Sequence, residues 1–172
     1  MITHLRGKLV EKNPTHVIVE CAGVGYFVNI SLHTYSLLGD EEQVMLHTHL
    51  QVREDAHTLF GFADRQEREI FRLLLSVSGI GATTARTMLS SLTPTQVRDA
   101  IASGNVPSIQ AVKGIGAKTA QRVILDLKDK VMKIQGMSEV SLESNNTNKE
   151  EALSALEVLG FVRKQAEKAV DK

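Results

Sequence analysis

The fold is decided by a nine-residue stretch that occurs twice, as Val77-Ser78-Gly79-Ile80-Gly81-Ala82-Thr83-Thr84-Ala85 and as Val112-Lys113-Gly114-Ile115-Gly116-Ala117-Lys118-Thr119-Ala120. The copies start 35 residues apart and agree at seven of nine positions. Helical sequence flanks each copy, so the repeat predicts two helix–hairpin–helix motifs in tandem. The glycines permit positive φ and close approach of another backbone, and the isoleucine between them can fill the gap between the helices.

Each hairpin is expected to bind a phosphate, because such a turn presents free backbone N–H groups at the positive end of the second helix. Contacts from the backbone to phosphate carry no base information, so binding should be independent of DNA sequence. A Gly-x-Gly that merely separates two helices is the alternative, and the duplication favours phosphate binding over it. The expected contact residues are Ser78, Gly79, Ile80, Gly81, Thr83, Lys113, Gly114, Ile115, Gly116, Lys118 and Arg122.

The two hairpins differ in charge. Lys113, Lys118 and Arg122 surround the second hairpin, whereas Ser78 and Thr83 occupy the two lysine positions in the first. The first hairpin is therefore expected to attract phosphate more weakly and to depend on its hydroxyl groups and on Arg86.

A nucleotide site is not expected. Gly116-Ala117-Lys118-Thr119 resembles the end of a P-loop, but that loop requires Gly where Ala117 and Val112 stand. Cys21 is the single cysteine, which excludes an intrachain disulfide and a CxxC metal site. We therefore expect no cofactor and no metal.

The net charge is zero over 172 residues, with 20 Lys and Arg against 20 Asp and Glu, which argues against coating nucleic acid through bulk positive charge. The charge is unevenly divided, however. Residues 1–65 hold five basic and eight acidic residues, residues 66–136 hold ten and five, and residues 137–172 hold five and seven, giving −3, +5 and −2. Such shifts mark domain boundaries.

Residues 1–63 alternate apolar and polar residues with the period of strands that bury one face. Five short strands are expected, at 5–10, 17–21, 24–30, 44–50 and 58–62, with a short helix at 34–38. Five strands in so short a segment predict a small barrel such as an OB-fold.

Three further segments complete the predicted α+β multidomain organisation. Residues 64–135 form the tandem helix–hairpin–helix domain, with helices that begin at a capping-box-like Asp64 and Glu67, at Thr93, and at Ala117, the last ending near Met132. Residues 136–148 lack periodicity and predict a flexible linker. Residues 149–172 predict two short helices, with Leu153, Leu156 and Leu159 on one face of the first.

Other side chains that could bind a metal or take part in catalysis have simpler structural explanations. Glu54 and Asp55 lie between two strands. Adjacent carboxylates in a turn could hold a metal or act as general acids, but solvated turn charges are the simpler explanation on composition alone. His47 and His49 share one strand face, for which an exposed polar surface is favoured over a metal site. Cys21 continues an apolar strand face and is expected in the core.

The chain as a whole resembles the RuvA family of Holliday-junction-binding proteins. Beside the paired hairpins, the resemblance is carried by Leu5-Arg6-Gly7, Gly23-Val24-Gly25-Tyr26, Val52-Arg53-Glu54-Asp55-Ala56, Leu59-Phe60-Gly61-Phe62, Gln66-Glu67-Arg68 and Ala155-Leu156-x-x-Leu159-Gly160-Phe161. It implies an OB-fold, a tandem helix–hairpin–helix domain and a small UBA-like helical domain. It also implies a non-catalytic subunit that binds four-way junction DNA in recombination, repair and the SOS response.

The resemblance assigns further roles. Glu54 and Asp55 become an acidic pin, four copies of which surround the centre of an open junction in a homotetramer, or in an octamer on DNA. Leu153, Leu156, Leu159 and Phe161 become the surface for the RuvB ATPase motor, and the RuvC resolvase becomes a further partner. Because Lys172 falls inside the family's final helices, the motor-binding domain is expected to be incomplete here.

Two other functions are less consistent with this sequence. A helix–hairpin–helix glycosylase or lyase needs a catalytic Asp or Lys beside an aromatic pocket, but no aromatic residue lies near Asp126, and Trp is absent. A single-strand-binding OB-fold needs basic charge on the barrel, whereas residues 1–65 are net negative. Without a signal sequence or membrane span, a cytoplasmic location with no membrane partner is expected.

Overall fold

The structure is a computed structural model that describes residues 1–39, 41–140, 152–153, 156, 161 and 163–170. It divides into unit 1, Met1–Met132, and unit 2, Lys133–Lys172. Leu159 and most of the predicted linker lie outside the described residues.

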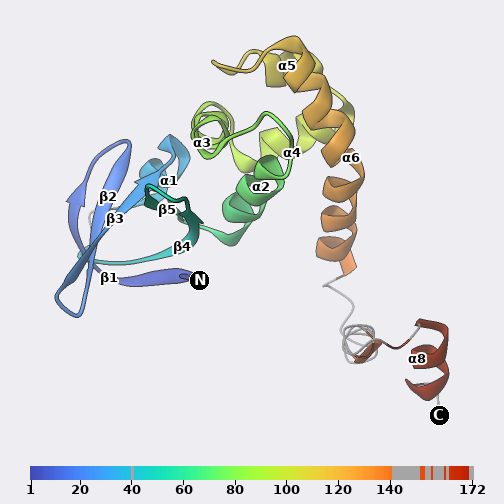
Figure 1. Ribbon diagram of the computed structural model, residues 1–172, viewed down its shortest axis with the longest axis horizontal. Helices are drawn as coiled ribbons and strands as arrows, with labels where there is room; N and C mark the ends of the chain where they lie inside the picture. The colour runs from blue at the N-terminus through green and yellow to red at the C-terminus, as the bar shows by residue number, and fades with distance from the viewer. Residues whose placement is uncertain (40, 141–151, 154–155, 157–160, 162, 171–172) are drawn as a thin grey trace. The chain divides into compact units, whose positions relative to one another are not determined.

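Five strands form a closed barrel in unit 1 (Figure 1). The strands are β1 (His4–Lys12), β2 (His16–Cys21), β3 (Val24–Ile30), β4 (Gln43–Val52) and β5 (His57–Phe62). Their order around the barrel is β1-β2-β3-β5-β4, with β3 and β5 parallel and the other pairs antiparallel. The predicted OB-like barrel is thereby confirmed, and closure leaves no long free sheet edge.

The barrel is closed around small and branched residues. Val17, Val19, Val28 and Leu46 are fully buried. Gly7 is required by close packing, because a Cβ there would lie 2.0 Å from the backbone oxygen of Glu20 on β2. A side chain larger than hydrogen at this position would separate β1 from β2.

The rest of unit 1 is helical. The helices are α1 (Leu32–Leu37), α2 (Arg65–Leu75), α3 (Ala82–Ser91), α4 (Pro94–Ser103), α5 (Val106–Gln110) and α6 (Ala117–Val140). The predicted start of α4 at Thr93 is confirmed, since Thr93 and Gln96 form a reciprocal capping box, and Gly104 ends the helix with φ of 71°. Helix α6 extends eight residues past the predicted end at Met132, so the first five residues of the predicted linker are helical.

A buried polar cluster joins the barrel side of unit 1 to α2. The side chain of Asp64 accepts a hydrogen bond from the Glu67 backbone N–H at 2.7 Å, as predicted for an N-cap. The Glu67 carboxylate does not complete a capping box, which corrects the prediction; it accepts hydrogen bonds from the hydroxyls of Ser31 and, at 2.5 Å, Thr34. Burial raises the pKa of Glu67, and these hydrogen bonds oppose the shift.

The two strand histidines are not on an exposed polar face, contrary to the prediction. His47 and His49 are both half-buried. The His49 ring packs edge-on against Phe71 of α2, with 5.5 Å between ring centroids. Burial lowers the pKa of each imidazole, and nearby arginines of α2 lower it further.

Candidate nucleic-acid interface

The first hairpin, residues 76–81, joins α2 to α3 through one tight turn. The backbone N–H of Ile80 donates to the Val77 oxygen at 3.1 Å. Gly79 has φ of 94°, in the left-handed region that favours glycine. Val77 and Ile80 are buried, and between them Ser78 and Gly79 are exposed. The isoleucine therefore fills the space between the helices, as the sequence predicted.

The second hairpin, residues 111–116, repeats this geometry between α5 and α6. The Ile115 N–H donates to the Val112 oxygen at the same 3.1 Å, and Gly114 has φ of 90°. Val112 and Ile115 are buried, while Lys113 and Gly116 are exposed. Two equal hydrogen-bonded turns confirm that the sequence repeat is a structural repeat.

The helices that follow the hairpins begin differently from the other helices of unit 1. Helices α1, α2, α4 and α5 each have an N-cap side chain that accepts a backbone N–H bond. Helix α3 begins at Gly81 with no side-chain cap, and Gly116, which precedes α6, has no side chain to supply one. The first backbone N–H groups of α3 and α6 therefore have no N-cap side chain as an acceptor and can donate to an external group.

Neither the backbone conformation nor the internal packing requires glycine at the second glycine position of each hairpin. Gly81 has φ of −91°, and the φ of Gly116 is also outside the left-handed region. A Cβ added at either glycine would meet nothing within 4 Å. Neither strain nor internal packing explains these two residues, whereas close approach of an external group does.

The polar side chains beside the hairpins are exposed. Ser78 and Thr83 at the first hairpin and Lys113 and Lys118 at the second are all solvent-exposed. The structure therefore brings the polar residues and the glycines of each predicted contact set to the surface around one turn, whereas Ile80 and Ile115 of those sets are buried and their N–H groups donate within the turns. A helix N-terminus with adjacent lysines suits an anion.

Arg122 connects the two hairpins. It lies on α6 after the second hairpin, but its Nη1 donates to the backbone oxygen of Ser78 in the first hairpin at 3.3 Å. A cation thus lies beside the hairpin that lacks lysines. The repeat itself gave no signal for this contact, because Thr87 occupies the equivalent position in the first copy.

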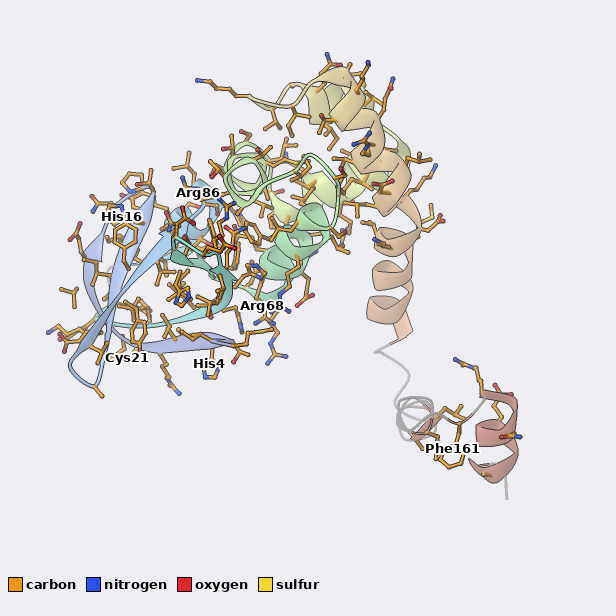
Figure 2. The ribbon with its side chains drawn as sticks, in the orientation of Figure 1. His4, His16, Cys21, Arg68, Arg86 and Phe161 are labelled. Atoms are coloured by element: carbon orange, nitrogen blue, oxygen red, sulfur yellow. The ribbon has the colours of Figure 1, made fainter. Side chains whose placement is uncertain are left out.

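Arg86, the cation expected to assist the first hairpin, is directed toward the barrel, so its contribution to phosphate binding stays a prediction. Its Nη1 donates to Asn29 Oδ1 at 3.0 Å and to the Thr15 oxygen at 3.2 Å, both on the barrel side of α3. Figure 2 shows Arg86 between α3 and the barrel. Its guanidinium is used to attach the helices to the barrel.

The turn between β4 and β5 carries Glu54 and Asp55. The Arg53 N–H donates to the Ala56 oxygen at 2.8 Å, which closes the turn and leaves both carboxylates exposed. Neither forms an ion pair with any residue that the structure describes. Uncompensated negative charge at a strand turn repels other anions.

The described part of unit 2 places three of the four residues predicted to bind the motor. Leu153 is 4% exposed, Leu156 is half-buried and Phe161 is 54% exposed. The Phe161 N–H donates to the Leu156 oxygen at 3.0 Å, and α8 (Arg163–Val170) follows. Leu153 is thus a core residue here, and Phe161 offers apolar surface.

Two further features of the described residues bear on function, a possible set of metal ligands and the length of the apolar helices. The group that could offer three metal ligands is His33, Asp64 and Glu67, but the Glu67 oxygens already accept two hydroxyl hydrogen bonds. Among the described helices, none is both long and apolar enough to cross a membrane.

Comparison with known families covers nearly the whole chain. Residues 1–61 match the RuvA N terminal domain, residues 71–129 match the SAM-like helix-hairpin-helix tandem, and residues 147–172 match the RuvA C-terminal domain.

Individual relatives align from end to end. The chain is 67% identical over 172 residues to a protein of Christiangramia forsetii, covering 100% of this chain and 89% of the relative. It is 63% identical to a protein of Flavobacterium psychrophilum with the same coverage, and 51% identical to one of Cytophaga hutchinsonii, covering 99% of this chain and 88% of the relative. All three are named Holliday junction branch migration complex subunit RuvA.

Proposed function

The chain belongs to the RuvA family, and we propose that it works as the junction-binding subunit of a Holliday junction branch migration complex. It is a non-catalytic DNA-binding subunit, and the ATPase that drives migration resides in its partner RuvB. The observation that supports this function is the pair of hairpins with the same turn hydrogen bond and positive-φ glycine, each followed by a helix that starts at a glycine with no side-chain cap. The glycosylase alternative is not favoured, since Asp126 is exposed on the middle of α6.

The hairpins hold the DNA arms by their phosphates. The free amides at the start of α3 and α6 donate to phosphate oxygens, and Gly81 and Gly116 let the DNA backbone approach. Lys113, Lys118 and Arg122 add longer-range attraction. Because no base edge is read, recognition of the junction comes from the arrangement of its four arms.

Glu54 and Asp55 act as a repeller where strands change partners. Four chains assemble as a homotetramer, which brings four β4–β5 turns to the junction centre. The carboxylates there repel phosphates and keep the exchanging strands apart. The absence of ion pairs to these two side chains, among the described residues, supports this role because a paired carboxylate would repel less.

The remaining partners extend this scheme. RuvB docks on the C-terminal domain, where exposed Phe161 is the contact and Leu153 is buried. Leu156, and by its spacing in the sequence Leu159, belong to the same proposed surface. A second tetramer completes an octamer on DNA, and RuvC cleaves the held junction. These events take place in the cytoplasm, where the chromosomal DNA lies.

A gel-shift titration tests the function. Four-way junction DNA should bind far more tightly than linear duplex of the same sequence, and affinity should fall with salt by a log–log slope of about −0.9 for each phosphate neutralised. Equal affinity for junction and duplex would overturn the proposal.

A second experiment tests the acidic turn. The double variant Glu54→Gln, Asp55→Asn should still bind junctions, because the hairpins are intact, but RuvB-driven branch migration should change in rate. If junction binding disappeared, the two carboxylates would be ligands and not repellers.

A further inference from the structure

A second cationic site lies in unit 1, formed by residues that neither the hairpins nor the β4–β5 turn use. A cavity of about 300 Å³ opens where β1, β4 and α2 meet. Figure 2 labels two of its residues, His4 and Arg68, on the same side of α2. It is lined by Thr3, His4, Met45, His47, Arg65 and Arg68.

The cavity has an excess of positive charge. This charge comes from the two guanidiniums of α2, Arg65 and Arg68, and two imidazoles from β1 and β4 also line the cavity. The adjacent carboxylate, Glu69, is shared, lying 3.4 Å from Arg68 Nη2 and 3.5 Å from Arg72 Nη1. Burial and the two arginines lower the pKa of the His47 imidazole, and the Asp64 carboxylate only partly offsets this shift.

Arg68 has an unsatisfied donor inside this cavity wall. Its Nη1 donates to the Thr3 oxygen at 3.0 Å and its Nη2 to Glu69. Its Nε is buried and has no hydrogen-bond partner among the described residues. Buried donors are nearly always paired, and a charged one left alone is especially unfavourable, so the site lacks an acceptor.

We propose that this cavity binds an acidic side chain from a second copy of the chain, as part of the interface between subunits. The inference rests on the proposed tetramer. In a closed ring each subunit contacts its neighbour through two different surfaces, so a cationic cavity on one requires an acidic group on the other. The net charge of −3 over residues 1–65 supplies such groups, including the exposed Glu20 and Glu41.

A carboxylate fits this site better than a DNA phosphate. Arg68 Nε has almost no accessible surface, so an incoming acceptor reaches it only if the surrounding side chains move apart. A glutamate or aspartate carries its oxygens on a narrow, flexible stem, whereas a duplex phosphate is held between two sugars. Removing one member of a buried charge pair at an interface mainly speeds dissociation.

The test measures assembly of the full chain without DNA. Arg68→Gln is compared with Arg72→Gln, which also removes a guanidinium beside Glu69 but lies outside the cavity. Sedimentation over a dilution series should show the Arg68 variant dissociating at about 30-fold or more higher concentration than the parent, with Arg72→Gln unchanged. Equal dissociation of the Arg68 variant and the parent would overturn the inference.

Further measurements separate the possible failures. Exposed Arg65→Glu should also weaken assembly without unfolding the chain, which covers the case in which Arg68→Gln fails to fold. Junction affinity is measured in parallel. A variant that stays assembled but loses junction affinity would show that the cavity binds DNA. A parent chain that never assembles would contradict the proposed tetramer. The selectivity of the parent chain for junctions over duplex tests the proposed function separately.

Discussion

The two hairpins have the same backbone and different surroundings. Both have an equal turn hydrogen bond and a positive-φ glycine. In the first copy Ala82 is buried and Arg86 binds the barrel; in the second, Ala117 and Gln121 at the equivalent positions are exposed. The repeat thus preserves the backbone that we propose binds anions, while the side chains differ: in the first copy Arg86 contacts the barrel, and in the second copy Lys113 and Lys118 are exposed.

The largest expected effect comes from placing a carboxylate at the second glycine of either hairpin. Gly116→Asp should lower junction affinity about tenfold to a hundredfold, because Asp caps the helix amides and repels phosphate. Thermal stability should hold or rise, since Asp is a favoured N-cap and the site is open. Gly81→Asp should follow the same pattern with a smaller loss, because fewer lysines surround it.

A matched control distinguishes the DNA effect from general acidity. Thr93→Asp places the same residue at the N-cap of α4, which is not part of a hairpin. Its junction affinity should equal that of the parent chain in the same gel shift. Loss of affinity in this control, or unfolding of Gly116→Asp, would contradict the interpretation of the open glycines.

The next largest effects distinguish the role of Arg122 in DNA binding from the role of Arg86 in fold stability. Arg122→Gln should lower junction affinity about tenfold, since one charge near both hairpins is lost. Arg86→Gln should instead destabilise the fold by about 1–3 kcal/mol through its two barrel hydrogen bonds. Denaturant unfolding and binding, measured on both variants, check this; a reversed pattern would mean that the roles are exchanged.

A smaller effect is expected from exchanging charge between the copies. Thr83→Lys should tighten junction binding a few-fold and steepen the log–log salt slope by about 0.9, whereas Lys118→Thr should do the opposite. The double exchange should restore the parent slope. If Thr83→Lys left the slope unchanged, the first hairpin would not be near phosphate.

The smallest expected difference is in pH dependence. Helix α2, before the first hairpin, contains the buried Glu67, whereas α5, before the second, has no ionisable residue. Because burial raises the pKa of Glu67, the folded chain keeps a proton that the unfolded chain has lost. Its contribution is therefore greatest below the ordinary glutamate pKa and falls as pH rises to the raised value.

Glu67→Gln provides the measurement of that contribution. The difference in unfolding free energy between the parent and this variant should change with pH across that window and be flat above it. Exposed Glu69→Gln, on the same helix, is measured in parallel as the control for removal of a carboxylate. A difference that rises with pH would mean that the hydrogen bonds to Ser31 and Thr34 outweigh burial.

Local patterns accounted for the elements and for the hairpins. Alternating residues predicted the strands, and the Gly-Ile-Gly repeat predicted the turns, because both depend on neighbours in sequence. Contacts between distant segments could not be read in this way. Arg122 and Ser78 are 44 residues apart, and Arg86 and Asn29 are 57 apart. The position of Glu67 in the sequence fits a capping box, yet its carboxylate accepts hydrogen bonds from the hydroxyls of Ser31 and Thr34, at the start of α1. These groups come close to Glu67 only in the folded chain.

The open space around Gly81 and Gly116 has a genetic consequence. A chain altered at Gly7 would fail to close its barrel and would be removed as an unfolded product, leaving normal subunits unaffected. A chain altered at Gly81 or Gly116 would fold and, if the proposed tetramer forms, enter the same rings as normal subunits. Mutations at the two hairpin glycines should therefore be dominant in a cell that carries both alleles, and mutations at the barrel glycine recessive.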